Sequence, residues 1–175
     1  EFLREEVYLC VPEALLRQYY TPEEIQNIKE RSIQGADLRD FARLPFSLMT
    51  NRLGGRIREQ FRQAGVEPWA FFTGPSTAQT LPLCASGTAA CFSTNLSLVE
   101  QLDQMGEQMN IFPLMDRGEP MVQRLSLLRH RQRYLTHFAK YFMELLFDST
   151  AALDRIPVLR VAGGGRAVEK SVENV

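Results

Sequence analysis

Mainly apolar runs and amphipathic segments alternate along residues 45–93. Three short runs, 46–49, 69–72 and 89–92, have the composition of buried strands. Two segments between them, 52–64 and 77–85, read as helices. Strands that alternate with helices predict a mostly parallel sheet flanked by helices, so we assign the chain to the α/β class.

The segment 52–64 has the clearest helical pattern. Leu53, Ile57 and Phe61 recur at four-residue spacing, whereas charged residues, mostly arginine, occupy the other positions. This pattern is typical of a helix that packs one face on a sheet and exposes the rest. Gly65 is the expected C-terminal cap of this helix.

Further elements are predicted on both sides of this stretch. A buried strand is expected over 7–11, which is rich in β-branched and aromatic residues. It should end at Pro12, because proline has no N–H to donate to the ladder. The motif Thr21-Pro22-Glu23-Glu24 is a helix start signal, and Pro82 is expected to kink or shorten the helix over 77–85. The remaining predictions are a helix over 14–20, a short helix from Asp37, a helix that buries Leu98, Leu102 and Met105, strands over 111–115 and 122–129, and a helix over 134–147.

Polar side chains gather where the predicted strands end and the next helices begin. Ligands bind parallel sheets at the carboxyl ends of their strands, and a helix N-terminus favours a carboxylate. These residues are therefore candidate ligand contacts, although each could instead serve only as a helix cap. The candidates are Thr50, Asn51, Thr73, Ser76 and Thr77, with Ser93 and Thr94 as weaker ones because either could cap the helix around Leu98.

Composition limits the other functions that the chain could have. Twenty basic and 21 acidic residues give a net charge of −1, so there is no overall positive field for nucleic acid. No apolar run is long enough to span a membrane, and the first residues do not resemble a signal peptide. We therefore expect a cytoplasmic protein without membrane contact.

Other reactive residues do not form a convincing catalytic or metal site. The three cysteines, Cys10, Cys84 and Cys91, lack metal-ligand spacing, and we interpret them as reduced, buried and inert thiols. His130 and His137 are expected at the surface, and the basic run 129–133 at a solvated turn. The glycines at 163–165 lack the Lys-Ser/Thr of a phosphate loop. We predict neither metal nor cofactor, and no enzymatic activity.

The order of several segments resembles one known family. Residues 38–46 (LRDFARLPF) and 57–68 (IREQFRQAGVEP), the helix end and strand over 85–92, and the segment 124–128 look like the second lobe of the effector-binding domain of LysR-type transcriptional regulators. The resemblance covers residues 7–148. Ala89 stands near the place of a second glycine in the family pattern, which puts the approach of that strand to a ligand in doubt.

The resemblance implies a type 2 periplasmic-binding-protein-like fold, in which two Rossmann-like lobes are joined by crossing strands. Residues 1–12 would be a crossover strand from a missing first lobe, and 13–120 the second lobe. Residues 121–150 would hold the returning strand and C-terminal helix, and 151–175 a flexible tail. In the family that helix packs on the first lobe, so its apolar face here needs another cover.

The resemblance also implies a function. The chain would be the ligand-sensing part of a LysR-type regulator, with a small-molecule inducer bound between the lobes, and helix ends and hydroxyls there suit a carboxylate. The regulator would be a homodimer or homotetramer and would bind DNA through a domain absent from this chain. The alternatives are a solute-binding protein of a transporter and, with less support, a small α/β enzyme.

Overall fold

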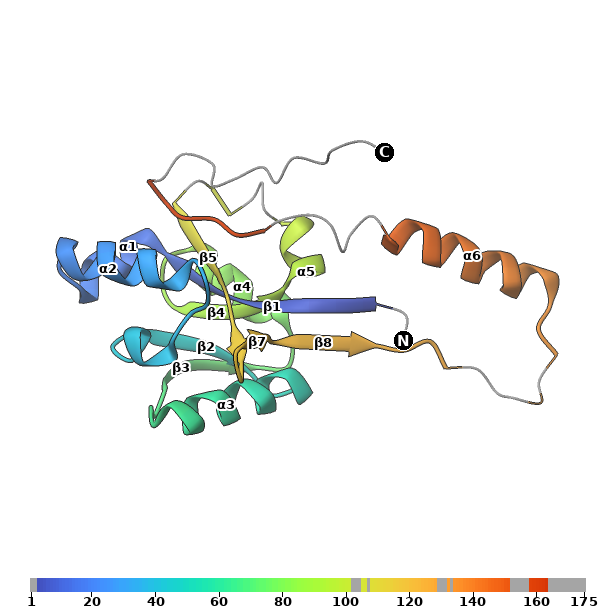
Figure 1. The fold of residues 1–175 in the computed structure, drawn as a ribbon, viewed down its shortest axis with the longest axis horizontal. Coiled ribbons are helices and arrows are strands. Elements are labelled where there is room, and N and C mark those ends of the chain that lie inside the picture. The colour runs from blue at the N-terminus through green and yellow to red at the C-terminus, as the bar shows by residue number, and fades with distance from the viewer. Residues whose placement is uncertain are drawn as a thin grey trace.

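The computed structural model describes residues 3–101, 105–106, 108–128, 132, 134–151 and 158–163. Its main feature is a six-stranded sheet with the order β3-β2-β4-β1-β5, and β8 pairs with one end of the long strand β1 (Figure 1). The strands of this sheet are β1 (Leu3–Pro12), β2 (Pro45–Met49), β3 (Trp69–Gly74), β4 (Ala90–Thr94), β5 (Met109–Pro113) and β8 (Val122–Leu125). A separate small hairpin joins β6 (Met115–Asp116) to β7 (Glu119–Pro120).

The sheet is mixed, and most of its strands run in one direction. Strand β2 is parallel to both β3 and β4, whereas β1 is antiparallel to β4, β5 and β8. Strand β1 therefore runs against the other five. The predicted α/β class and the mostly parallel sheet are confirmed.

The helices follow the predicted order along the chain. They are α1 (Glu13–Tyr19), α2 (Pro22–Ser32), the 3-10 helix η1 (Leu38–Phe41), α3 (Arg52–Ala64), α4 (Thr77–Ala85), α5 (Asn95–Val99) and α6 (His137–Ala151). Thr21 and Glu24 form a reciprocal capping box at the start of α2, as the sequence predicts. Helix α5 is shorter than the helix predicted around Leu98, and Leu102 lies outside the described residues.

Two hydrophobic clusters form the core. The larger joins the sheet to α1, α2, η1 and α3, and it includes an aromatic group in which the Phe46 ring lies 4.9 Å from Phe61 and 5.8 Å from Phe92. The smaller contains Cys10 and Leu81 and joins the sheet to α4 and α5. Side chains alternate between the two along β1, since Leu9 belongs to the first and Tyr8 and Cys10 to the second.

The start of α3 is fixed closely against the end of β2. A Cβ atom at Gly54 would lie only 1.8 Å from the backbone oxygen of Met49, so no other residue fits there. At the other end, Gly65 adopts a left-handed conformation with φ of 70° and caps the helix as predicted. The helix is therefore held rigidly at the edge of the sheet where ligands were expected.

The C-terminal region differs from the predicted flexible tail over 151–175. Residue Ala151 ends α6, and part of the tail lies against the sheet, where Arg160 forms an isolated bridge with Ile111 of β5. Val158 and Ala162 are buried. The prediction was wrong for residues 158–163, because backbone pairing with β5 offsets the entropy of ordering them. The other residues of that range lie outside the described part.

Helix α6 extends away from the sheet (Figure 1). Several large apolar residues on it are exposed, and the side chain of Phe138 has 85% of its surface accessible. The strand that leads to it, β8, ends at Leu125 rather than at 129 as predicted. No helix among the described residues is long and apolar enough to cross a membrane.

Candidate functional site

Three of the polar residues predicted at the strand ends, Thr50, Asn51 and Thr77, make contacts at the carboxyl ends of β2 and β3. The backbone amide of Thr50 donates to the carbonyl of Gly74 at 2.9 Å, which joins the ends of β2 and β3. The side-chain amide of Asn51 donates to the carbonyl of Pro75 at 3.3 Å. The hydroxyl of Thr77 contacts the sulfur of Met49 at 3.5 Å. These contacts bring together segments that lie more than twenty residues apart.

The capping explanation holds for one candidate but not for all. The side-chain oxygen of Asn51 accepts the backbone amide of Gly54 at 3.0 Å, so Asn51 caps α3. Ser76 and Thr94 occupy the N-cap positions of α4 and α5, but neither side chain makes a capping hydrogen bond. The hydroxyl of Thr94 instead donates to the buried carboxylate of Glu5 at 2.8 Å.

Thr73 and Ser93 lie in different surroundings. Thr73 is exposed on the edge strand β3, beside Leu48 of β2. Ser93 is fully buried on β4, opposite Tyr8 of β1, and its hydroxyl has no hydrogen-bond partner within the described part of the chain. The structure therefore leaves Thr73 open to solvent and Ser93 in the interior.

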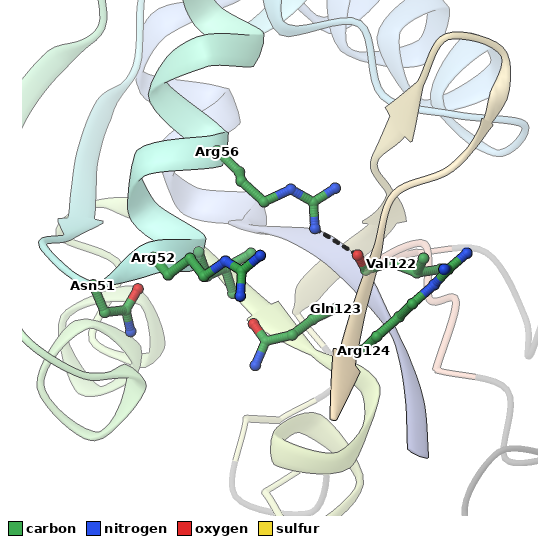
Figure 2. Close-up of a pocket in the computed structure, with 7 residues that line it drawn as sticks. Asn51, Arg52, Arg56, Val122, Gln123 and Arg124 are labelled. Atoms are coloured by element: carbon green, nitrogen blue, oxygen red, sulfur yellow. Dashed lines mark hydrogen bonds between the residues drawn. The ribbon is translucent and has the colours of Figure 1, made fainter. Parts of the chain in front are cut away.

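A pocket of about 520 Å³ opens beside this edge, between the start of α3 and strand β8 (Figure 2). Only Asn51 among the predicted contacts lines it. The other lining residues are Arg52, Leu53, Arg56, Val122, Gln123 and Arg124. The lining contains three arginines and no acidic residue, so its own charged groups are all positive.

Arginine side chains also connect the pocket walls. Arg56 donates from α3 to the carbonyl oxygen of Val122 on β8 at 2.5 Å, and its guanidinium lies 3.7 Å from the carboxylate of Asp116. Two residues further along α3, Arg58 does not line the pocket and donates to the carbonyl of Met49 at 2.6 Å. These bonds hold α3 against the end of β2 and against β8.

The sequence patterns did not identify most of the pocket. The arginines of α3 were interpreted as outer-face residues, and nothing local predicts that β8 crosses in front of them. Only the resemblance pointed to this arrangement, because it assigned residues 121–150 to a strand that returns to the first lobe and to the C-terminal helix. The pairing of β8 with Leu3–Glu6 and the bond from Arg56 to Val122 place Gln123 beside α3.

The three cysteines are buried, as predicted. Cys10 and Cys91 are paired across β1 and β4, and the Cys84 thiol donates to the carbonyl of Cys10 at 3.4 Å. Burial raises the pKa of Cys84, and contacts with the Cys10 and Cys84 thiols raise that of Cys91. Both thiols therefore stay protonated near neutral pH. In the described ranges, no group of three or more His, Cys, Asp or Glu side chains is placed to hold a metal ion.

The predicted surface histidines and basic turn are only partly described. His137 is exposed in the first turn of α6. His130 and most of the run 129–133 lie outside the described residues.

Comparison with protein-family models and with curated proteins finds no match. Comparison with solved structures finds similar folds at low sequence identity. HinK, a LysR family transcriptional regulator from Pseudomonas aeruginosa, is 16% identical with a TM-score of 0.55, and the match covers 85% of this chain and 46% of HinK. The effector-binding domain of QuiR, in complex with shikimate, is 13% identical with a TM-score of 0.52, and the match covers 86% of this chain and 64% of that domain.

The bromide-bound regulatory domain of HypT from Salmonella typhimurium is similar to the same degree. It is 12% identical with a TM-score of 0.52, and the match covers 86% of this chain and 63% of the HypT domain. The chain thus spans less than two thirds of each of these structures, which are regulators or regulatory domains rather than enzymes. The chain has the periplasmic-binding-protein-like α/β fold of LysR effector-binding domains.

Proposed function

We propose that this chain is the ligand-sensing part of a LysR-type transcriptional regulator and is not an enzyme. The observation that carries the proposal is the pocket between α3 and β8, which opens at the carboxyl ends of the parallel strands. Open α/β sheets bind ligands at this edge. A ligand there would contact a helix of the lobe and a strand that leads out of it.

The proposed ligand is a small molecule that carries a carboxylate. The charged side chains of the pocket lining are all arginines, and the N-terminus of α3, where Asn51 and Arg52 are exposed, adds the favourable dipole of a helix N-terminus. Two structures of similar fold hold anions, shikimate in QuiR and bromide in HypT. In this pocket the proposed contacts are Asn51, Arg52 and Gln123. Thr50, Thr73, Ser76, Thr77 and Ser93 remain predicted contacts at the neighbouring strand ends.

The function of the whole regulator is part of the same proposal. It would be a cytoplasmic homodimer or homotetramer that binds DNA through a domain outside this chain. The exposed apolar face of α6 supports a contact with a further part of the protein, because soluble proteins seldom leave such a face in water. Ligand binding would change the relative stability of two arrangements of the oligomer.

Two experiments test this function. A thermal-shift screen of metabolites should identify a compound that raises the melting temperature, because a ligand that binds only the folded state stabilises it. In the full-length protein, Thr50→Ala and Thr73→Ala should each weaken the transcriptional response to that compound and leave DNA affinity unchanged. An unchanged response in both variants would contradict the contacts, and a screen without any stabilising compound would contradict the function.

A further inference from the structure

Strand β8 is paired along one side only within the described residues. It pairs with β1 at four positions, from Leu3 opposite Leu125 to Glu6 opposite Val122, and no other strand in the described ranges pairs with it. On the side of α3, the bond from Arg56 to the Val122 carbonyl provides a direct link. Beyond β8 the chain continues to α6, so the position of β8 bears on where α6 begins (Figure 1).

Two polar side chains face the space between α3 and β8. Figure 2 shows Arg52 and Gln123 extending into this space from the helix and the strand, whereas Arg124 extends to the other side of β8. Within the part of the chain that the structure describes, the Arg52 guanidinium and the Gln123 carboxamide make no hydrogen bond or ion pair. They are therefore available as donors to a ligand.

The neighbouring polar groups are already engaged. The Asn51 side chain caps α3 and donates to Pro75, and Arg56 is bonded to Val122 and lies near Asp116. Glu5, which is opposite Gln123 in the strand pairing, is buried and accepts from Thr94. A planar anionic group is the chemistry that a guanidinium and an amide donor bind best.

We propose that a carboxylate of the ligand binds between Arg52 and Gln123 and thereby clamps β8 to α3. This inference rests on the proposed function and adds how the site is regulated. The ligand supplies the second link between the helix and the strand, next to the permanent link made by Arg56. Occupancy of the pocket then fixes the strand that leads to α6.

The first test asks whether charge selects the ligand. Binding of acetate and succinate to the 175-residue chain is compared with binding of acetamide and succinamide by calorimetry. We expect binding of the acids only, with succinate weakened about tenfold or more in Arg52→Gln, because a charge-assisted bond is lost. Arg62→Gln, which makes the same charge change at the far end of α3, should bind as the natural chain does. Equal binding of the amides, or no binding of the acids, would overturn the proposal.

The second test asks whether the ligand holds the strand. Amide hydrogen exchange at residues 122–125 is measured with and without succinate. Exchange should slow about threefold or more with succinate, in proportion to occupancy, and the effect should disappear in Gln123→Met. Gln18→Met, on the exposed side of α1, should keep it. Binding of succinate without slower exchange at β8 would overturn the clamp.

These results separate the inference from the function on which it rests. If the metabolite screen identifies an uncharged ligand that protects α3 but not β8, the clamp fails and the sensing function stands. If no metabolite in the screen binds, the sensing function itself fails.

Discussion

Two polar clusters lie beside the same sheet and differ in how completely their groups are paired. The closed cluster comprises Glu13, Lys29 and Asn110, which lie beneath the segment 158–163. The open cluster comprises Asn51, Arg52 and Gln123 at the pocket. Both combine charged and amide side chains, so residue type alone does not distinguish them.

In the closed cluster the chain supplies the partners. The Lys29 ammonium lies 2.8 Å from the Glu13 carboxylate and donates to the Ala162 carbonyl at 2.8 Å. Asn110 donates to Glu13 at 3.0 Å and accepts the Ala162 amide at 2.9 Å. Such a cluster stabilises the fold, and its charged and amide groups are already bonded to one another rather than to a ligand.

In the open cluster only the Asn51 side chain has hydrogen-bond partners within the described part of the chain. Arg52 and Gln123 stay partly in water, where unpaired donors cost little. In this fold, the partners of a polar group, rather than its chemistry, therefore separate structural networks from ligand sites.

The largest effect is expected in the closed cluster. Lys29→Met should lower the free energy of unfolding by about 3 kcal/mol, because it leaves the Glu13 carboxylate buried with a weakened set of partners. Urea unfolding at pH 7 measures the change. Lys140→Met on the exposed surface of α6 is the matched control and should change stability by less than about 0.5 kcal/mol. Similar losses in the two variants would contradict the structural importance of the closed cluster.

A pH titration should reveal the same ion pair. Burial favours a higher pKa for Glu13, but hydrogen bonds from Asn110 and Lys29 and the charges of Lys29 and Arg17 outweigh burial and lower it. A carboxyl whose pKa is lower when folded stabilises the fold above its unfolded value of about 4.5, and this contribution is lost as pH falls through the folded value.

The measurement is the stability difference between the natural chain and Glu13→Gln. This difference should be largest near neutral pH and should shrink below about pH 4.5. A difference that stays constant as the pH falls would show that the Glu13 charge does not contribute.

The smallest effect on stability is expected in the open cluster. Arg52→Gln should change the free energy of unfolding by less than about 0.5 kcal/mol, since Arg52 is exposed and a ligand site does not hold the fold together. The same urea experiment measures it in ligand-free buffer. If Arg52→Gln lowered the free energy of unfolding as much as Lys29→Met does, Arg52 would be a structural residue and the two clusters would not differ.

Local features of the fold were predictable from the sequence. The capping box at Thr21 and Glu24, the amphipathic face of α3 and the cap at Gly65 depend on residues within a few positions of one another. The same is true of Asn51, which was predicted at the join of a strand and a helix and lies there. Short-range sterics and hydrogen bonds determine such features.

Long-range pairings were not predictable in the same way. Asn110 and Ala162 are 52 residues apart, and their hydrogen bond overturned the prediction of a flexible tail at 158–163. Arg56 and Val122 are 66 residues apart, and their bond defines the pocket. No sequence pattern predicts either hydrogen bond, because each depends on the order of the strands in the sheet.

The sequence by itself determined the elements, their order, the α/β class and the edge of the sheet where ligand contacts were expected. Hydrophobic periodicity and helix caps are sufficient for this, since they act locally. Which polar groups are paired and which face the pocket became clear only from the three-dimensional arrangement of the strands and helices. Pairing depends on the three-dimensional meeting of distant segments, and this meeting places β8 across the start of α3.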